Sequence, residues 1–168
     1  MMRPTGQKNS VILTALLAVV KASIIGISVV MVVVTLAQVI FRYVLAEPLP
    51  WSEELARYCF VWIVFLGGAV GLERGFHLGV DLLVNAMPPG IRRGLEALTT
   101  MFIGVFAATV IWASVPVINM NMMQRSPALG VQMSWIYLAI PVSMVLIVLI
   151  CLERLIHILR TPAAEEGV

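Results

Sequence analysis

The chain has 168 residues, of which 61% are hydrophobic and 12% are charged, and its mean hydropathy is +1.01. Because soluble domains carry roughly a quarter charged residues, these values exclude an ordinary water-soluble domain and indicate a protein that crosses a membrane several times. The net charge of +2 provides no basic surface for nucleic acid. The sequence also lacks a P-loop and any Ser, His and Asp order of catalytic spacing, so it does not indicate an enzyme.

The first predicted span covers residues 22–41, which contain no charged residue and match the length that crosses the bilayer core. Residues 11–20 are also apolar, but Lys21 interrupts the run. Two arrangements are open: an extended, tilted helix from which Lys21 reaches the lipid headgroups, or a separate first turn in the membrane interface. Arg3 and Lys8 ahead of a long apolar stretch, with no small-residue cleavage site after it, indicate an uncleaved anchor.

The second predicted span covers residues 55–72. Ser52 is the predicted N-cap, and Glu53 and Glu54 fall in the first turn, where the helix dipole favours acidic side chains. The charged and small residues from Glu73 onward mark the end of this helix.

Between the second and third spans, residues 77–87 combine leucines with Asp81 and Asn85, a pattern typical of a short helix in the membrane interface. Two prolines and a glycine then break the chain before the third predicted span, residues 95–118. Pro116 is expected to kink the far end of that span.

After a polar loop over residues 119–132, the fourth predicted span covers residues 135–152, with Pro141 as a kink that membrane helices tolerate. Residues 1–160 are expected to form a single transmembrane domain, and residues 161–168 a disordered cytoplasmic tail. The predicted fold is therefore an all-α integral membrane protein with four transmembrane helices.

The distribution of cations predicts the orientation of the helices, because short loops rich in Lys and Arg stay in the cytoplasm. Most cations lie on the side of the two termini: Arg3, Lys8, Lys21, Arg74, Arg92, Arg93, Arg154 and Arg160. Both termini are therefore expected in the cytoplasm, and the 43–51 and 119–132 loops in the periplasm of a bacterial inner membrane. Trp51, Trp135 and Tyr137 then lie at the outer interface, which favours amphipathic rings.

A polar cluster is predicted where the first and second spans meet at the outer membrane face. It comprises Arg42, Glu53, Glu54 and Arg57, with Trp51 beside them. Glu53 and Arg57 are four residues apart, in the favourable acid-first order. Since ionisable groups near hydrocarbon are costly, they are expected to pair or to face protein. Three readings are open: an ion-pair network that fixes the hairpin, a docking surface for another protein, or a proton relay.

Small residues recur at every fourth position through Gly67, Gly71, Gly75 and Gly79. Such a stripe lets helices approach closely, so Gly67 and Gly71 are predicted helix-packing positions. The neighbouring helix belongs either to this chain or to a partner subunit.

No cofactor is predicted. His77 and His157 lie on one predicted side of the membrane and raise the alternative of a haem site, but a contact between His77 and Asp81 explains the first histidine more simply. A group of methionines in the 119–132 loop raises the alternative of Cu(I), although methionine also suits adaptable protein contacts. Cys59 and Cys151 fall within apolar runs at different depths and are read as small buried residues, not as a disulfide.

The stretch from Arg42 to Asp81 resembles the small membrane subunit of tripartite ATP-independent periplasmic (TRAP) transporters. The resemblance rests on the order and spacing of these residues: Arg42 and Tyr43; Trp51, Ser52, Glu53, Glu54, Leu55, Ala56 and Arg57; Gly67, Gly68 and Ala69; Arg74, Gly75, His77 and Asp81. Among them, Arg74, His77 and Asp81 form the signature on the predicted cytoplasmic side. The second half of the chain agrees only in hydropathy.

The resemblance implies a role in sodium-driven uptake of organic acids. A periplasmic solute-binding protein would deliver the solute to a large polytopic membrane subunit, and that subunit would hold the solute and sodium sites. The small subunit would anchor the large one among the membrane lipids and contribute to docking of the binding protein. The alternatives are a small multidrug exporter, which needs a membrane-embedded acid that the first span lacks, a cytochrome or quinone enzyme subunit, and a scaffold protein outside transport.

Overall fold

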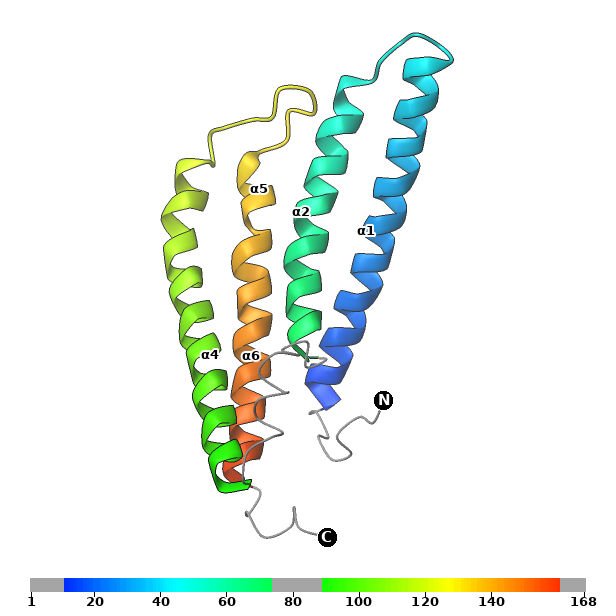
Figure 1. Cartoon of the computed structure of the whole chain (residues 1–168). Coiled ribbons are helices and arrows are strands. Elements are labelled where there is room, and N and C mark those ends of the chain that lie inside the picture. The colour runs from blue at the N-terminus through cyan, green and yellow to red at the C-terminus, as the bar shows by residue number, and fades with distance from the viewer. Residues whose placement is uncertain (1–10, 74–88, 161–168) are drawn as a thin grey trace.

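The computed structural model describes residues 11–73 and 89–160 (Figure 1). Four of its helical segments are long and apolar enough to cross a membrane, which confirms the predicted four-span fold. The predicted interfacial helix over residues 77–87 and the predicted tail over residues 161–168 lie outside the described residues. The helices are α1 (Val11–Tyr43), α2 (Pro50–Glu73), α4 (Pro89–Met120), α5 (Met133–Tyr137) and α6 (Ala139–Arg160).

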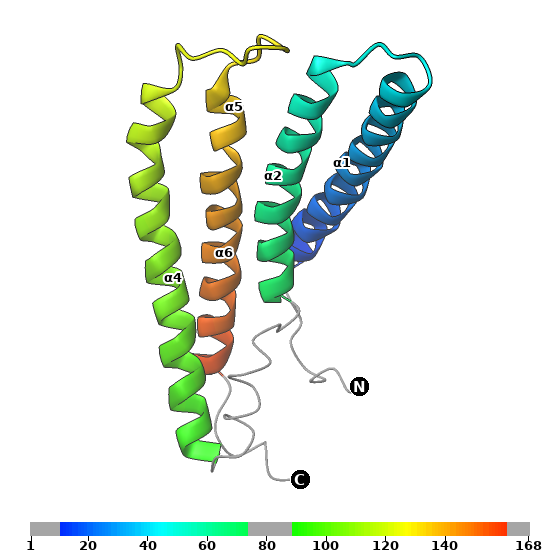
Figure 2. The ribbon, with the colours of Figure 1, turned by 45° about the horizontal axis from the view of Figure 1, so that its top comes forward.

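The long helices stand side by side in the order α4, α6, α2, α1 (Figures 1 and 2). Helix α6 packs against α4 and α2, and α2 packs against α1. Helix α1 begins and α6 ends at the same end of the bundle, here called the terminal end. Residues 44–49 and 121–132 connect the helices at the opposite end, here called the loop end. The first and second spans therefore form one antiparallel hairpin, and the third and fourth spans form another.

Helix α1 is continuous from Val11 to Tyr43, so the extended-helix arrangement of its first part is the one observed. The buried residues of α1 are Leu13, Leu17 and Val20, which share one helix face. They form a cluster with buried residues of the two neighbouring helices: Leu66, Ala69 and Val70 of α2, and Leu146 and Ile150 of α6. The first three turns of α1 thus hold the terminal end of the bundle together.

Lys21 of α1 forms an ion pair with Glu73 of α2. Its ammonium group lies 3.3 Å from a carboxylate oxygen of Glu73, and the two side chains are 35% and 22% exposed. From Lys21 to Arg42, α1 rises roughly 30 Å, about the thickness of the hydrocarbon core. The ion pair between α1 and α2 therefore marks one edge of the membrane-spanning part, and Arg42 marks the other.

Helices α4 and α6 approach each other through small residues. A Cβ atom added to Gly104 would lie 3.5 Å from the Cβ of Cys151, at ordinary contact distance. Ala107 on α4 and Ala139 and Ser143 on α6 are fully buried. Small side chains permit close packing in a medium where hydrophobicity does not drive helices together. Cys151 and Cys59 are buried free thiols, as predicted.

Pro141 explains why the fourth span is divided into α5 and α6. Proline lacks the N–H group that would bond to the carbonyl of Tyr137, and its ring crowds that carbonyl. The regular helix is interrupted at Leu138 and resumes at Ala139. Pro116, in contrast, lies inside α4, which continues to Met120.

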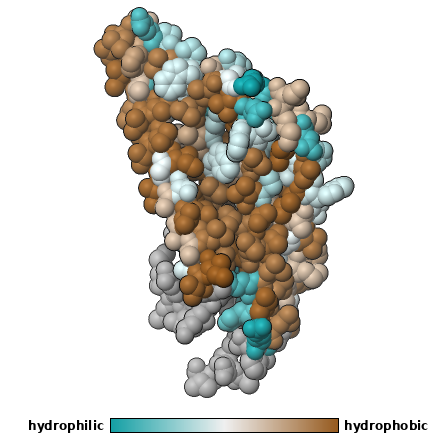
Figure 3. Space-filling model, turned by 180° about the vertical axis from the view of Figure 1, so that it is seen from behind, coloured by the Kyte–Doolittle hydropathy of each residue, from teal (hydrophilic) through white to brown (hydrophobic). Residues whose placement is uncertain are grey.

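Hydroxyl groups in the spans bond to the backbone of their own helix. Thr35, Thr109 and Ser143 donate to carbonyls three or four residues earlier, at 2.8, 2.9 and 2.8 Å. In the absence of water these bonds satisfy the hydroxyls, so the described helices keep an apolar exterior. Figure 3 shows hydrophobic residues over most of the middle of one face, with hydrophilic residues towards both ends.

We predict that Gly104→Ala is tolerated, because a methyl group fits at 3.5 Å from Cys151 and alanine favours the helix. Gly104→Leu is expected to destabilise the protein by about 1–3 kcal/mol, because it overpacks the contact between α4 and α6. Thermal unfolding in detergent measures both. Gly26→Leu is the control, since a Cβ there meets no atom within 4 Å. Equal losses for the leucine variants at the two positions would contradict the assigned contact.

Candidate functional site

The segment between α4 and α5 folds into a compact hairpin at the loop end. Arg125 pairs with Gln132 as an antiparallel bridge, and the backbone N–H of Ser126 donates to the carbonyl of Val131 at 2.9 Å. Gly130 has a φ of +67°, a conformation that glycine adopts without steric cost. The Arg125 guanidinium donates to the Gly130 carbonyl at 3.1 Å. The loop therefore presents one defined shape.

Glu54 fastens this hairpin to α2. One carboxylate oxygen of Glu54 accepts hydrogen bonds from the backbone N–H groups of Ala128, at 3.1 Å, and Leu129, at 2.8 Å. Successive N–H groups that converge on a carboxylate form a small anion-binding nest. This contact therefore joins α2 directly to the segment that precedes the fourth span.

The Tyr58 hydroxyl adds a second link between α2 and the far side of the hairpin. It lies 3.5 Å from the sulfur of Met133, at the start of α5, and donates to it. Figure 1 shows the 121–132 segment reaching from α4 across the top of α5 towards α2. Glu54 and Tyr58, one turn apart, therefore hold the two hairpins of the bundle together at the loop end.

Among residues 11–73 and 89–160, the predicted ion-pair network of Arg42, Glu53, Glu54 and Arg57 does not form. Glu53 and Glu54 are neighbours, but successive helix residues point about 100° apart, so Glu54 faces the hairpin while Glu53 is exposed. Arg42 is exposed beside the ring of Tyr43, 6.0 Å from its centre. The docking-surface reading of the cluster stays a prediction.

Four exposed side chains form what we call the loop-end rim: Arg42, Trp51, Glu53 and Arg125. They come from α1, α2 and the hairpin. Trp51, with Trp112 of α4 and Trp135 of α5, also exposes an indole ring near the loop end. Exposed tryptophans are typical of a membrane–water interface. The rim therefore lies where the protein meets water.

Among the described residues, the predicted glycine stripe has no close neighbour at Gly67. A Cβ added there would meet no heavy atom within 4 Å, whereas the close internal approach occurs at Gly104. Gly67 and Gly71 are half-buried. A helix-packing role towards another subunit stays a prediction for both.

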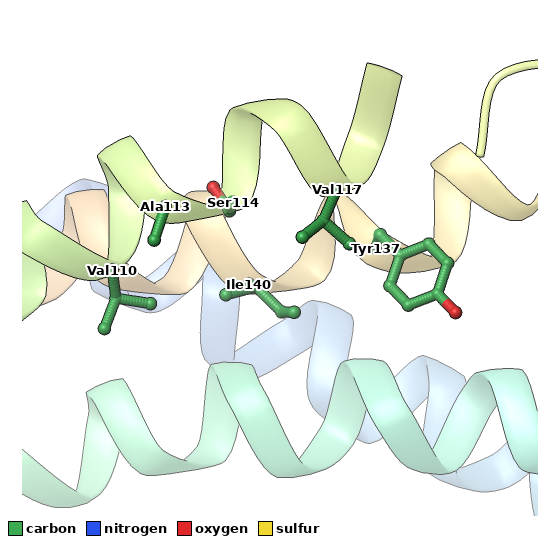
Figure 4. Close-up of a pocket in the computed structure, with 6 residues that line it drawn as sticks. All are labelled: Val110, Ala113, Ser114, Val117, Tyr137 and Ile140. Atoms are coloured by element: carbon green, nitrogen blue, oxygen red, sulfur yellow. The ribbon is translucent and has the colours of Figure 1, made fainter. Parts of the chain in front are cut away.

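An apolar pocket of about 200 Å³ lies between α4 and the α5–α6 junction (Figure 4). Its lining residues are Val110, Ala113, Ser114, Val117, Tyr137 and Ile140. The Ser114 hydroxyl already donates to the Ile111 carbonyl at 2.7 Å, and no cation lines the pocket. Because an organic acid needs a charge partner or several donors when it leaves water, this pocket does not suit such a solute.

No group of three His, Cys, Asp or Glu that could hold a metal occurs within residues 11–73 and 89–160. Met133, which follows the 119–132 loop, accepts a hydrogen bond from the Tyr58 hydroxyl. The predicted signature residues Arg74, His77 and Asp81 lie outside the described residues.

Sequence reasoning missed the partners of two charged residues. The partner of Glu54 is a pair of backbone N–H groups, which leave no trace in the residue types of the hairpin. The Lys21 and Glu73 pair did leave a signal, since both charges interrupt apolar runs near the same end of their helices.

The fold and the loop-end surface define a small integral membrane protein of four spans, without an ionisable side chain in the middle of any span. Residues 31–161 match the family described as tripartite ATP-independent periplasmic transporters, DctQ component. The chain belongs to this family. It is therefore a small permease subunit of a TRAP transporter, a transport component and not an enzyme.

Several relatives of the chain are named as TRAP transporter permease proteins. The chain is 30% identical over 128 residues to the C4-dicarboxylate TRAP transporter small permease protein DctQ of Pseudomonas aeruginosa, covering 73% of this chain and 61% of that protein. It is 26% identical over 119 residues to the sialic acid TRAP transporter small permease protein SiaQ of Vibrio cholerae, covering 71% and 69%. It is 31% identical over 113 residues to the sialic acid TRAP transporter permease protein SiaT of Haemophilus influenzae, covering 67% of this chain but only 18% of that longer protein.

We predict that Glu54→Ala frees the hairpin, because the N–H groups of Ala128 and Leu129 lose their acceptor. Amide hydrogen exchange at these two positions should accelerate roughly tenfold or more. Glu53→Ala is a matched control, since Glu53 is the same residue type one position earlier and is exposed. Exchange that is unchanged in Glu54→Ala, or equally faster in both variants, would contradict the assigned role of Glu54.

Proposed function

We propose that this small permease subunit supports and anchors a large polytopic TRAP membrane subunit. We further propose that it contributes to docking of a periplasmic solute-binding protein during sodium-driven uptake of organic acids. The observation that chiefly supports the docking role is the bond between Glu54 and the hairpin, because it gives the loop-end rim a fixed shape. A preformed surface binds at lower entropic cost than a mobile loop.

The distribution of polar groups supports a partner that carries the solute. Ion-coupled transporters place ionisable groups or broken helices near the bilayer midplane. The spans of this chain have no charged residue at that depth, and the pocket between α4 and the α5–α6 junction is lined by apolar side chains. The sodium and solute sites are therefore assigned to the large subunit.

The relatives support a large membrane subunit as the partner of this chain. SiaT is named as a permease protein, and the region that resembles this chain is only 18% of its length. In such a relative the small region shares one polypeptide with a much longer segment. This arrangement supports a large membrane subunit as the partner of the present chain, and the names of the DctQ and SiaQ relatives support an organic acid as the solute.

The cation distribution supports an inner-membrane orientation with both termini in the cytoplasm. The terminal end holds Lys21, Arg93, Arg154 and Arg160, whereas the loop end holds Arg42, Arg57 and Arg125. At the terminal end the Arg93 guanidinium also donates to the Ile158 carbonyl, near the last turn of α6. The loop-end rim then faces the periplasm, where a solute-binding protein would meet it.

Cysteine labelling tests the orientation and the docking role together. In Arg125→Cys, a membrane-impermeant maleimide is expected to react in intact cells, because residue 125 is exposed at the loop end. Leu159→Cys is the control at the terminal end, where residue 159 is also exposed, and should react only after permeabilisation. A bulky maleimide on residue 125 is expected to weaken binding of the solute-binding protein to the purified complex roughly tenfold or more, because it obstructs the rim.

Labelling of Leu159→Cys but not Arg125→Cys in intact cells would contradict the orientation. Normal capture of the binding protein by complex that is fully labelled at residue 125 would contradict the docking role of the rim. The buried native cysteines Cys59 and Cys151 are replaced by alanine in both variants, so that the reagent reports only the introduced thiol.

A further inference from the structure

One face of α2 is exposed along most of its length and combines charged, large and small residues. We call it the α2 seam, and it runs at alternating four- and three-residue spacing through Glu53, Arg57, Phe60, Val64, Gly67 and Gly71. The first four are exposed and the two glycines are half-buried. Spacing that alternates between four and three residues keeps a seam on one side of a helix and is typical of a helix that faces another helix.

On this seam, Arg57 is the ionised side chain that lies furthest from the loop end, and an ionised group near hydrocarbon carries a large free-energy cost. It lies about 10 Å along α2 from Pro50, at a depth where charged side chains approach hydrocarbon. Arg57 is exposed and forms no ion pair with another described residue, not even with Glu53 four residues earlier on the same seam. Glu54, the acid one turn before Tyr58, is already bonded to the hairpin. An ionised side chain in such a position is expected to meet a partner from another protein.

The lower part of the seam has free space where a second helix backbone fits. At Gly67, and at the neighbouring exposed Gly68, a Cβ would meet no heavy atom within 4 Å. Glycine lowers the stability of a helix by about 1 kcal/mol relative to alanine, and contact with lipid does not offset this loss. Close approach of another helix offsets the loss of helix stability at glycine, through backbone and side-chain packing. The charged part of the seam at Arg57 and the glycine part at Gly67 both indicate that the neighbour is a helix of another protein.

We propose that the α2 seam is the contact surface for a transmembrane helix of the large subunit, and that this helix presents a carboxylate to Arg57. The proposal rests on the proposed function, because it assumes that the large subunit exists. Positive charge on Arg57 selects an acidic partner group. Phe60 and Val64 supply apolar contact below this pair, and Gly67 and Gly71 set the closest approach of the two helices.

Photo-crosslinking in the assembled complex tests the seam. The photoreactive residue p-benzoylphenylalanine is placed at Val64, or at control positions Val105 of α4 and Val145 of α6. These three valines are 50%, 58% and 45% exposed, and each lies roughly 20 Å from the loop end of its own span. Irradiation of native membranes is expected to join the large subunit to position 64 with a yield several-fold above both controls.

An assembled complex in which position 64 forms no crosslink, or in which it does not exceed position 105 or 145, would overturn the seam while leaving the proposed function intact. Purification of the chain without any large subunit would overturn the proposed function, and with it the occupant of the seam. The two failures are therefore distinguished by the protein that co-purifies before irradiation.

Substitutions provide a second test that does not depend on crosslinking chemistry. Gly67→Leu is expected to lower recovery of the large subunit roughly tenfold, because the added side chain occupies the space for the partner helix. Gly26→Leu on α1 is the control, since Cβ atoms at both positions meet nothing in this chain. Arg57→Ala should likewise reduce recovery, with partial rescue by Arg57→Lys, which keeps the charge. Unchanged recovery in both Gly67→Leu and Arg57→Ala would contradict the proposal.

Discussion

The lack of water in the bilayer core is the constraint on which the rest of this structure depends, because every polar group must then find a partner in protein. The hydroxyls of Thr35, Thr109 and Ser143 bond to their own helices, and Lys21 bonds to Glu73 where α1 and α2 leave the hydrocarbon. At the loop end Glu54 accepts two backbone N–H groups of the hairpin. Arg57 differs from these groups, because its charge forms no ion pair with any of the described residues. The same constraint that stabilises the subunit therefore also indicates where it is incomplete.

These contacts divide the molecule into two parts with different tasks. The terminal end is held by an apolar cluster of three helices around Leu17, Leu66 and Leu146, and α4 is joined to α6 by the close approach of Gly104 to Cys151. The loop end buries mainly small polar side chains such as Ser52 and Ser126, and its order comes from hydrogen bonds within the hairpin and to Glu54. A stable base and a polar, ordered rim are what a subunit needs if it anchors one partner in the membrane and meets another in the periplasm. The absence of an ionisable group at the midplane is consistent with this division, since the solute then passes through the other subunit.

Much of the fold could be predicted from the sequence, because hydrophobic length alone identifies transmembrane helices. The four spans follow from this rule, although α1 begins at Val11 and not at the predicted residue 22, and the break at Leu138 follows from the missing N–H of Pro141. The site was less predictable. The sequence singles out Glu53, Glu54 and Arg57 as unusual charges. It does not show that Glu54 turns towards a hairpin more than seventy residues away while Glu53 faces outward. Likewise, the glycines of α2 look equivalent to Gly104 in the sequence, and only the packing shows that Gly104 has an internal neighbour and Gly67 has none.

The central claim is that this chain works as the small subunit beside a large membrane protein, and co-purification tests it most directly. The protein is tagged at its C-terminus, extracted from native membranes in mild detergent, and its companions are quantified by mass spectrometry. The account predicts a large polytopic membrane protein in about equal molar amount, as expected for a stable heteromeric interface. Recovery of the chain alone, or only as a homodimer, from membranes that also contain a large TRAP membrane subunit would contradict the claim.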